Sequence, residues 1–114
     1  MEKEILVAKH CVPCSLGASP LNAQQISPLF NQLDGWVLVG EKSIEKTFHF
    51  KDFSKPLQLL NAIAFIAEAQ GHHPDFELTW GRLFIRLYTH KIEGLSLNDF
   101  IVAKKIDELV KVSS

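Results

Sequence analysis

Residues 68–76 read Glu-Ala-Gln-Gly-His-His-Pro-Asp-Phe, a stretch in which a helix ends and an extended segment begins. Apolar residues at helical spacing run from Leu59 to Ala67 and stop before Gly71, a residue suited to the left-handed conformation that ends helices. Pro74 biases His73 towards extended geometry, because the proline ring crowds the residue before it. The sequence therefore predicts that His72 and His73 lie at a helix-to-strand corner with a rigid frame.

A third histidine, His90, ends the next apolar run, and Asp99 follows it after a short loop. Three imidazoles and a carboxylate, with no serine or cysteine nucleophile beside them, favour proton transfer over covalent catalysis. Histidine suits this work because it populates both protonation states near neutral pH. Two alternatives are three structural histidines and a zinc site, the latter disfavoured because neighbouring extended residues point to different sides.

Upstream of the corner, residues 22–33 carry apolar side chains at helical spacing, and Pro28 predicts that this helix begins near Ser27 or bends there. Residues 36–39 and 43–50 are predicted strands, the second because apolar and polar side chains alternate along it. His49 in that strand is interpreted as a surface residue. Asp52 or Ser54 is expected to cap the central helix that leads to the corner.

Downstream, residues 77–80 are predicted to form a strand, Gly81 a turn or bulge, and residues 82–90 a further strand. In the last of these, Leu83, Ile85 and Leu87 share one face, and Phe84, Arg86, Tyr88 and His90 share the other. Ser96-x-x-Asp99 matches the start of a capping box, and the final helix carries an apolar stripe.

The expected element order is helix, two strands, helix, two strands, helix. Tight turns between paired strands favour an antiparallel sheet, so the fold class is α+β: a two-layer domain with a four-stranded antiparallel sheet and three helices on one face. A chain of 114 residues has room for one such domain. We assign it to residues 22–114, and residues 1–21 to a loop-rich N-terminal arm.

The arm contains His10, Cys11 and Cys14. This CxxC could be incidental, a redox pair or part of a metal site. Three ligands are one short of a closed tetrahedral zinc site, and a thioredoxin-type motif would need a strand before it. The incidental reading is favoured and the other two stay open.

Bulk composition excludes several classes of protein. Hydrophobic residues make up 46% of the chain and charged residues 22%, as in soluble globular proteins. A net charge of -1 argues against nucleic acid as a partner. No secretory signal is visible, the most apolar stretch is about half of a membrane span, and two cysteines make no disulfide framework. We expect a cytoplasmic protein with no membrane partner.

Across Glu68-x3-His72-His73-Pro74-x5-Trp80-x9-His90-x8-Asp99 the sequence resembles the pterin-4a-carbinolamine dehydratase family. Residues 48–53, Phe-His-Phe-Lys-Asp-Phe, and residues 89–96 also resemble it, so that the likeness extends from about residue 22 to residue 110. One departure is Phe76, where many members carry tryptophan.

The resemblance implies a lyase that dehydrates 4a-hydroxytetrahydropterin to quinonoid dihydropterin and so recycles the pterin cofactor of aromatic amino acid hydroxylases. It implies no metal and no organic cofactor. The implied catalytic residues are His72 and His90, which transfer protons, and His73, which binds or orients the pterin. The implied substrate-binding residues are Glu68, Pro74, Phe76, Trp80 and Asp99. Asp99 is expected to orient or charge-tune His90, or to act as a helix cap.

The same resemblance leaves two other functions open. Animal relatives also act as dimerization partners of a homeodomain transcription factor, so the fold can serve as a binding module. We expect a homodimer or homotetramer, with Leu97, Phe100 and Ile101 of the last helix available for association. An accessory role in molybdopterin metabolism is the third possibility.

Overall fold

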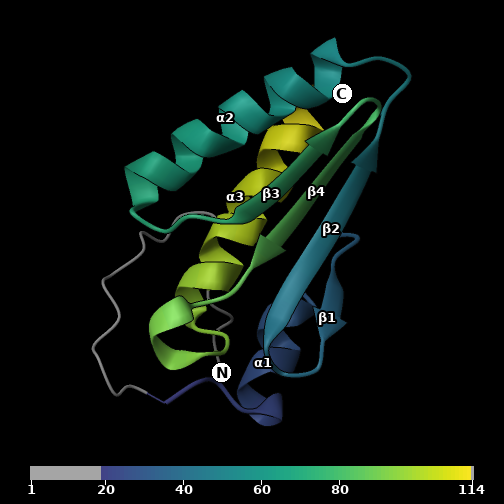
Figure 1. Cartoon of the computed structure of the whole chain (residues 1–114). Coiled ribbons are helices and arrows are strands. Elements are labelled where there is room, and N and C mark those ends of the chain that lie inside the picture. The colour runs from purple at the N-terminus through teal and green to yellow at the C-terminus, as the bar shows by residue number, and fades with distance from the viewer. Residues whose placement is uncertain (1–18, 114) are drawn as a thin grey trace.

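The computed structural model describes residues 19–113, and Figure 1 shows its helices and strands. Their order confirms the predicted one. The elements are α1 (Ala23–Phe30), β1 (Val37–Val39), β2 (Ser43–His49), α2 (Ser54–Gln70), β3 (Asp75–Thr79), β4 (Arg82–Leu87), the 3-10 helix η2 (His90–Ile92) and α3 (Leu97–Ser113).

The four strands form one antiparallel sheet in the order β1-β2-β4-β3. Two hairpins, β1-β2 and β3-β4, are joined where β2 pairs with β4, with Ile44 opposite Leu87. Figure 1 shows α3 behind β3 and β4, and α2 packs against α3 and the same two strands; this layering confirms the predicted α+β class. Among residues 19–113, no helix covers the opposite face of the sheet, which is called the open face below.

The core lies between the sheet and the helices. Leu83, Ile85 and Leu87 of β4 are completely buried there, as their alternation predicts. Phe100 and Ile101 of α3 are buried in the same cluster. The expectation that these two residues serve as an association surface is therefore wrong, because they fill the domain's own core.

Helix α1 begins earlier than the proline suggests. Asn22 and Gln25 form a capping box, each side chain accepting from the other residue's backbone N–H at 2.9 Å. The helix therefore begins at Ala23, and Pro28 lies inside it. A start near Ser27, which was one of the two predictions, is not observed. Beyond its end, Lys104 Nζ donates to the carbonyl of Gln32 at 3.0 Å, which ties this segment to α3.

The end of α2 confirms the predicted corner. Gly71 has φ of 66°. Its N–H donates to Glu68 O at 3.3 Å, and the N–H of His72 donates to Ala67 O at 3.2 Å. These two bonds make a Schellman motif, which fixes the backbone direction as the chain leaves the helix.

Strand β4 ends earlier than predicted. It stops at Leu87, Thr89 forms an isolated bridge with Gly94, and His90 begins the short helix η2. The backbone turns because Glu93 adopts a left-handed conformation (φ 51°), which brings Gly94 back to Thr89. His90 therefore projects from a tight loop and not from a strand. Within residues 19–113, no helix has the length and apolar character needed to cross a membrane.

Candidate active site

The three candidate histidines lie at one end of the β3-β4 pair. His72 and His73 precede the first residue of β3, and His90 follows the last residue of β4. Because β3 and β4 are antiparallel neighbours, the start of one lies beside the end of the other. The fold thus brings together the residues that the sequence analysis singled out from separate segments.

His72 is bonded to a buried carboxylate. Its side chain is 13% exposed, and its Nε2 lies 2.6 Å from Oδ1 of the completely buried Asp99. The other oxygen, Oδ2, accepts from Thr89 Oγ1 at 2.8 Å and from the backbone N–H of Ser96 at 2.9 Å. The Ser96 bond shows that Asp99 caps α3. The histidine bonded to Asp99 is His72. The prediction from the sequence was that this carboxylate orients His90.

This arrangement determines which ring nitrogen of His72 is available. An ionised carboxylate only accepts, so Nε2 of His72 donates to Asp99 and, in the neutral ring, Nδ1 is the acceptor. Thr89 donates its single hydroxyl proton to Asp99. The hydroxyl of Ser96, whose Oγ lies 2.7 Å from Thr89 Oγ1, therefore donates to Thr89. The carboxylate is held on three sides before any ligand arrives.

His73 and Glu68 form a second pair, on the exposed side of the corner. His73 Nε2 lies 2.6 Å from Glu68 Oε1, and both side chains are mostly exposed. Glu68 lies in the last turns of α2, so the pair spans the helix end. Pro74, the next residue, is buried and anchors the segment.

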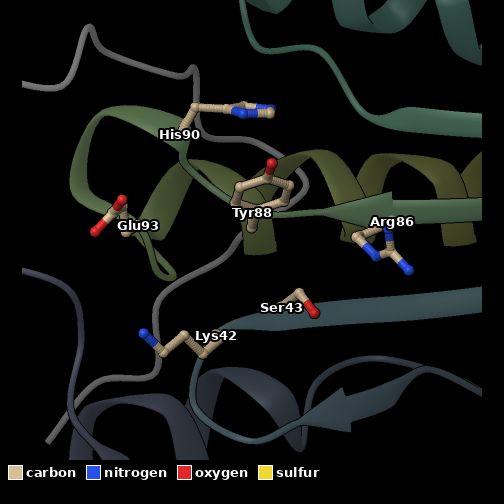
Figure 2. Close-up of a pocket in the computed structure, with 6 residues that line it drawn as sticks. All are labelled: Lys42, Ser43, Arg86, Tyr88, His90 and Glu93. Carbon is tan, nitrogen blue, oxygen red and sulfur yellow. The ribbon is translucent and has the colours of Figure 1, made fainter.

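His90 lies on the open face of the sheet. Its Nε2 is 4.0 Å from Asp75 Oδ1, and its ring centroid is 4.1 Å from that of Tyr88, with the planes tilted by 43°. Figure 2 shows the ring reaching over a cavity. The cavity has a volume of about 580 Å³, and this lies within the usual range of about 300–1,000 Å³ for ligand pockets. Its lining residues are Lys42, Ser43, Arg86, Tyr88, His90 and Glu93.

Arg86 is the most firmly held charge in this cavity. Its Nε donates to Glu45 Oε2 at 2.9 Å, and its guanidinium lies 5.2 Å from the ring centroid of Phe84. The hydrogen bond to Glu45 raises the pKa of Arg86 above its ordinary value, with further contributions from the negative charges of Glu45, Asp75 and Glu77 against an opposing effect of burial. Arg86 therefore remains a cation with a fixed orientation.

Most of the residues that line this cavity were not predicted from the sequence. The alternation in β4 placed Arg86 and Tyr88 on the same face as His90, and this signal could have identified them. Lys42 lies in the turn before β2 and Ser43 is the first residue of β2, and only the pairing of β2 with β4 brings them there.

Two predicted binding residues do not join the histidines. Trp80 is 69% exposed in the turn between β3 and β4, at the opposite end of β3. Phe76 packs against the core and pairs with Ile85, on the helix-covered face of the sheet.

The remaining candidate ligands give no metal centre in the part of the chain that is described. Among residues 19–113, no group of three or more His, Cys, Asp or Glu side chains is placed to hold a metal ion. His10, Cys11 and Cys14 lie outside the described residues.

Comparisons with known proteins agree with the resemblance noted in the sequence. A family model described as pterin 4 alpha carbinolamine dehydratase matches residues 19–109. A protein of Alkaliphilus metalliredigens is 44% identical over 104 residues, covering 90% of this chain and 94% of its own length. One of Rubrobacter xylanophilus is 42% identical over 104 residues, covering 91% and 97%. Both carry the provisional name pterin-4-alpha-carbinolamine dehydratase.

A solved structure shares the fold. It is titled transcriptional coactivator/pterin dehydratase from Brucella melitensis, and it superposes with a TM-score of 0.74 at 30% sequence identity. The match covers 80% of this chain and 98% of that one.

Proposed function

Because the chain belongs to the pterin-4a-carbinolamine dehydratase family, we propose that it dehydrates a 4a-hydroxytetrahydropterin to the quinonoid dihydropterin and so recycles the cofactor of an aromatic amino acid hydroxylase. In this reaction the C4a–O bond breaks, the proton on N5 is lost, a C4a=N5 double bond forms and water leaves. The enzyme must therefore deliver one proton to the departing oxygen and accept one from nitrogen.

The observation that carries this proposal is that each of the three histidines faces its own carboxylate. His72 faces Asp99 at 2.6 Å, His73 faces Glu68 at 2.6 Å, and His90 faces Asp75 at 4.0 Å. A carboxylate beside an imidazole orients the ring and fixes which of its nitrogens carries the proton. Three such pairs at one end of a hairpin supply the proton donors and acceptors that a dehydration needs.

The environments of the pairs support a division of roles. His72 is the general base, because its donation to Asp99 leaves Nδ1 as the acceptor for the N5 proton. His90 is the general acid, because its ring stands over the cavity on the open face. His73, held by Glu68 on the exposed side of the corner, binds and orients the pterin ring. Such acid–base pairs typically contribute about 10²- to 10⁴-fold in rate.

The test is stopped-flow absorbance of freshly generated 4a-hydroxytetrahydropterin, with and without the protein. We expect faster decay to the quinonoid product with the wild-type chain and no acceleration with the double variant His72→Ala/His90→Ala. Circular dichroism and a denaturation curve establish that the variant is folded. A folded double variant with wild-type turnover would refute the proposed roles, and a wild-type chain without any acceleration would refute the proposed reaction.

A second candidate function, self-assembly, is favoured by the outer surface of α2. Phe65 is 77% exposed there, and Leu57 two turns earlier is also exposed. Aromatic side chains are enriched at protein–protein interfaces, so an aromatic ring exposed on a helix is a candidate interface residue. We propose that a second copy of the chain covers this surface, giving a homodimer or homotetramer.

Sedimentation velocity tests the assembly. Phe65→Ser should shift the protein towards the monomer, whereas Val37→Ser, which removes an exposed apolar side chain from β1, should not. A monomeric wild-type protein at all concentrations would refute the assembly. Dissociation by the Val37 change alone would place the interface at β1 instead.

A further inference from the structure

The chemistry of the pterin determines what lies next to His90 when the ring is bound. In the pterin, C4a, N5 and C6 are consecutive atoms, so the substituent on C6 leaves the ring two bonds from the carbon that loses hydroxide. If His90 protonates that hydroxide, as proposed above, the C6 substituent extends into the space beside the His90 ring. In this structure that space is the cavity of about 580 Å³ on the open face.

The lining of this cavity consists mainly of hydrogen-bond donors. Lys42, Ser43, Arg86, Tyr88 and His90 can all donate, and among the lining residues within 19–113 Glu93 alone can only accept. A group rich in acceptor oxygens fits such a lining better than an apolar one does.

The charged side chains that line the cavity differ in whether another residue of the protein pairs with them. Arg86 is bonded to Glu45, which lies outside the lining, so much of its charge is compensated within the protein. Lys42 forms no ion pair with any residue of the described part of the chain, and Glu93 forms none there either. In the described part of the cavity, Lys42 is therefore the cation that is available to a ligand, and Glu93 is the charge that opposes it.

The positions of these side chains give the cavity a direction. Figure 2 shows His90 and Lys42 on opposite sides of it, with Tyr88 between them and Ser43 beside Lys42. A ligand whose pterin ring contacts His90 would place the end of its C6 substituent near Lys42 and Ser43. The Tyr88 ring would then lie beside the middle of that substituent.

We propose that this cavity binds the C6 substituent of the pterin and that Lys42 selects substituents ending in an anionic group, phosphate or carboxylate. The inference rests on the proposed dehydratase function. Ser43 and Tyr88 donate hydrogen bonds to the same group, and Arg86, fixed by Glu45, forms the cationic wall of the cavity. Glu93 limits the preference, because its carboxylate repels the same anion.

The experiment compares kcat/KM for four 4a-hydroxytetrahydropterins. Their C6 substituents are a methyl group, a hydroxyalkyl chain, the phosphate monoester of that chain, and a carboxyalkyl chain of equal length. We expect the wild-type enzyme to prefer one or both anionic substrates over the alcohol. The ratio of anion to alcohol should fall about three- to tenfold in Lys42→Gln, as expected for a partly exposed charged hydrogen bond, and should rise in Glu93→Gln.

The controls separate this inference from the proposed function. Lys51→Gln makes the same change of charge on a surface loop outside the cavity lining, and its ratio should stay at the wild-type value. Turnover of the methyl substrate tests the dehydratase reaction alone, so its absence would overturn the function and the inference with it. Turnover of the methyl substrate with equal rates for alcohol and anions, or a preference that Lys42→Gln leaves unchanged, would overturn the inference alone. The phosphate and carboxylate arms identify which anion is preferred.

Discussion

Asp99 Oδ1 lies 2.6 Å from His72 Nε2, although the two residues come from different elements, the first turn of α3 and the corner after α2. The same carboxylate caps α3 by accepting from the backbone N–H of Ser96. One side chain thus accepts a hydrogen bond from an otherwise unpaired backbone N–H at the start of a helix and also contacts the ring of His72.

The change Asp99→Asn tests the positioning role. The amide can still cap α3, but it can present an N–H to His72 and so favour the opposite tautomer. We expect kcat/KM to fall about 10²-fold, within the range of acid–base contributions, and the low-pH limb of the pH–rate profile to move. Thr89→Val, which removes one neutral donor from the same carboxylate, should have a smaller effect on rate. If Asp99→Asn keeps the wild-type kcat/KM and the wild-type pH–rate profile, Asp99 has no positioning role and acts only as a helix cap.

The pH dependence of kcat/KM distinguishes the acid from the base. A base must be deprotonated and an acid protonated, so the wild-type profile should be bell-shaped. His72→Gln should remove the fall in rate at low pH, and His90→Gln should remove the fall at high pH, each at a rate reduced by about 10²-fold or more. The opposite assignment of the two limbs would exchange the roles of the two histidines.

Gly81 and Gly71 form a matched pair for stability. Both have positive φ, 76° and 66°. An added Cβ at Gly81 would lie 2.8 Å from the backbone oxygen of Phe50, whereas at Gly71 it would meet nothing within 4 Å. Urea denaturation should show Gly71→Ala costing about 1–2 kcal/mol for the left-handed backbone and Gly81→Ala about 1–3 kcal/mol more for the clash. Equal losses would mean that the turn moves away from Phe50 without cost.

A buried ionic network stabilises the fold without touching the histidines. Asp107 accepts from Trp36 Nε1 at 2.8 Å, from the backbone N–H of Asp34 at 2.9 Å and from Lys46 Nζ at 3.1 Å. Asp107→Ala would leave a mostly buried ammonium group uncompensated, so we expect a loss of about 3–5 kcal/mol in the free energy of unfolding.

Glu108→Gln is the control for Asp107. It removes only the partly exposed pair with Lys104 at 3.7 Å and should cost less than about 0.5 kcal/mol. Turnover per folded molecule should be preserved in both variants, because Asp107 lies about 12 Å along α3 from Asp99 at 1.5 Å per residue. A loss of turnover in folded Asp107→Ala would show that this network also supports the site.

The division of the chain into an arm and a domain remains a prediction, and two truncations test it. The N–H of Leu21 donates to Leu95 O at 2.9 Å, and Pro20 packs on Gly94, in the loop that carries His90. A chain without residues 1–18 should keep its stability and turnover. A chain without residues 1–21 should lose about 0.5–1.5 kcal/mol with that hydrogen bond and should turn over more slowly. Inactivity of the shorter deletion, in a folded protein, would place part of the function in the arm.

The features predicted well from the sequence are those that local chemistry determines. Gly71 and Pro74 act on the backbone of their immediate neighbours, so the corner was predictable from a few residues. The alternation of Leu83, Ile85 and Leu87 identified the buried face of β4 for the same reason.

The features that were missed depend on distant parts of the chain. The bridge between Thr89 and Gly94 ends β4, and no local pattern marks it. Spacing alone gives no distance between Asp99 and either candidate histidine, so it could not choose His72 over His90. The apolar stripe of α3 is compatible with both a core and an interface, and only the sheet packed against it shows that Phe100 is core.

The turn after β3 is bonded to the segment that precedes α2. Gly81 exchanges backbone bonds with the segment ahead of α2, accepting from Phe50 N–H at 2.8 Å and donating to Asp52 O at 3.0 Å. At its other end α2 runs directly into β3 through His72 and His73. Helix α2 and the β3-β4 hairpin are thus connected at both ends. Between the two connections lies the 17-residue helix, which is about 25 Å long. The length of α2 therefore sets the separation between the turn that carries Trp80 and the corner that carries His72 and His73.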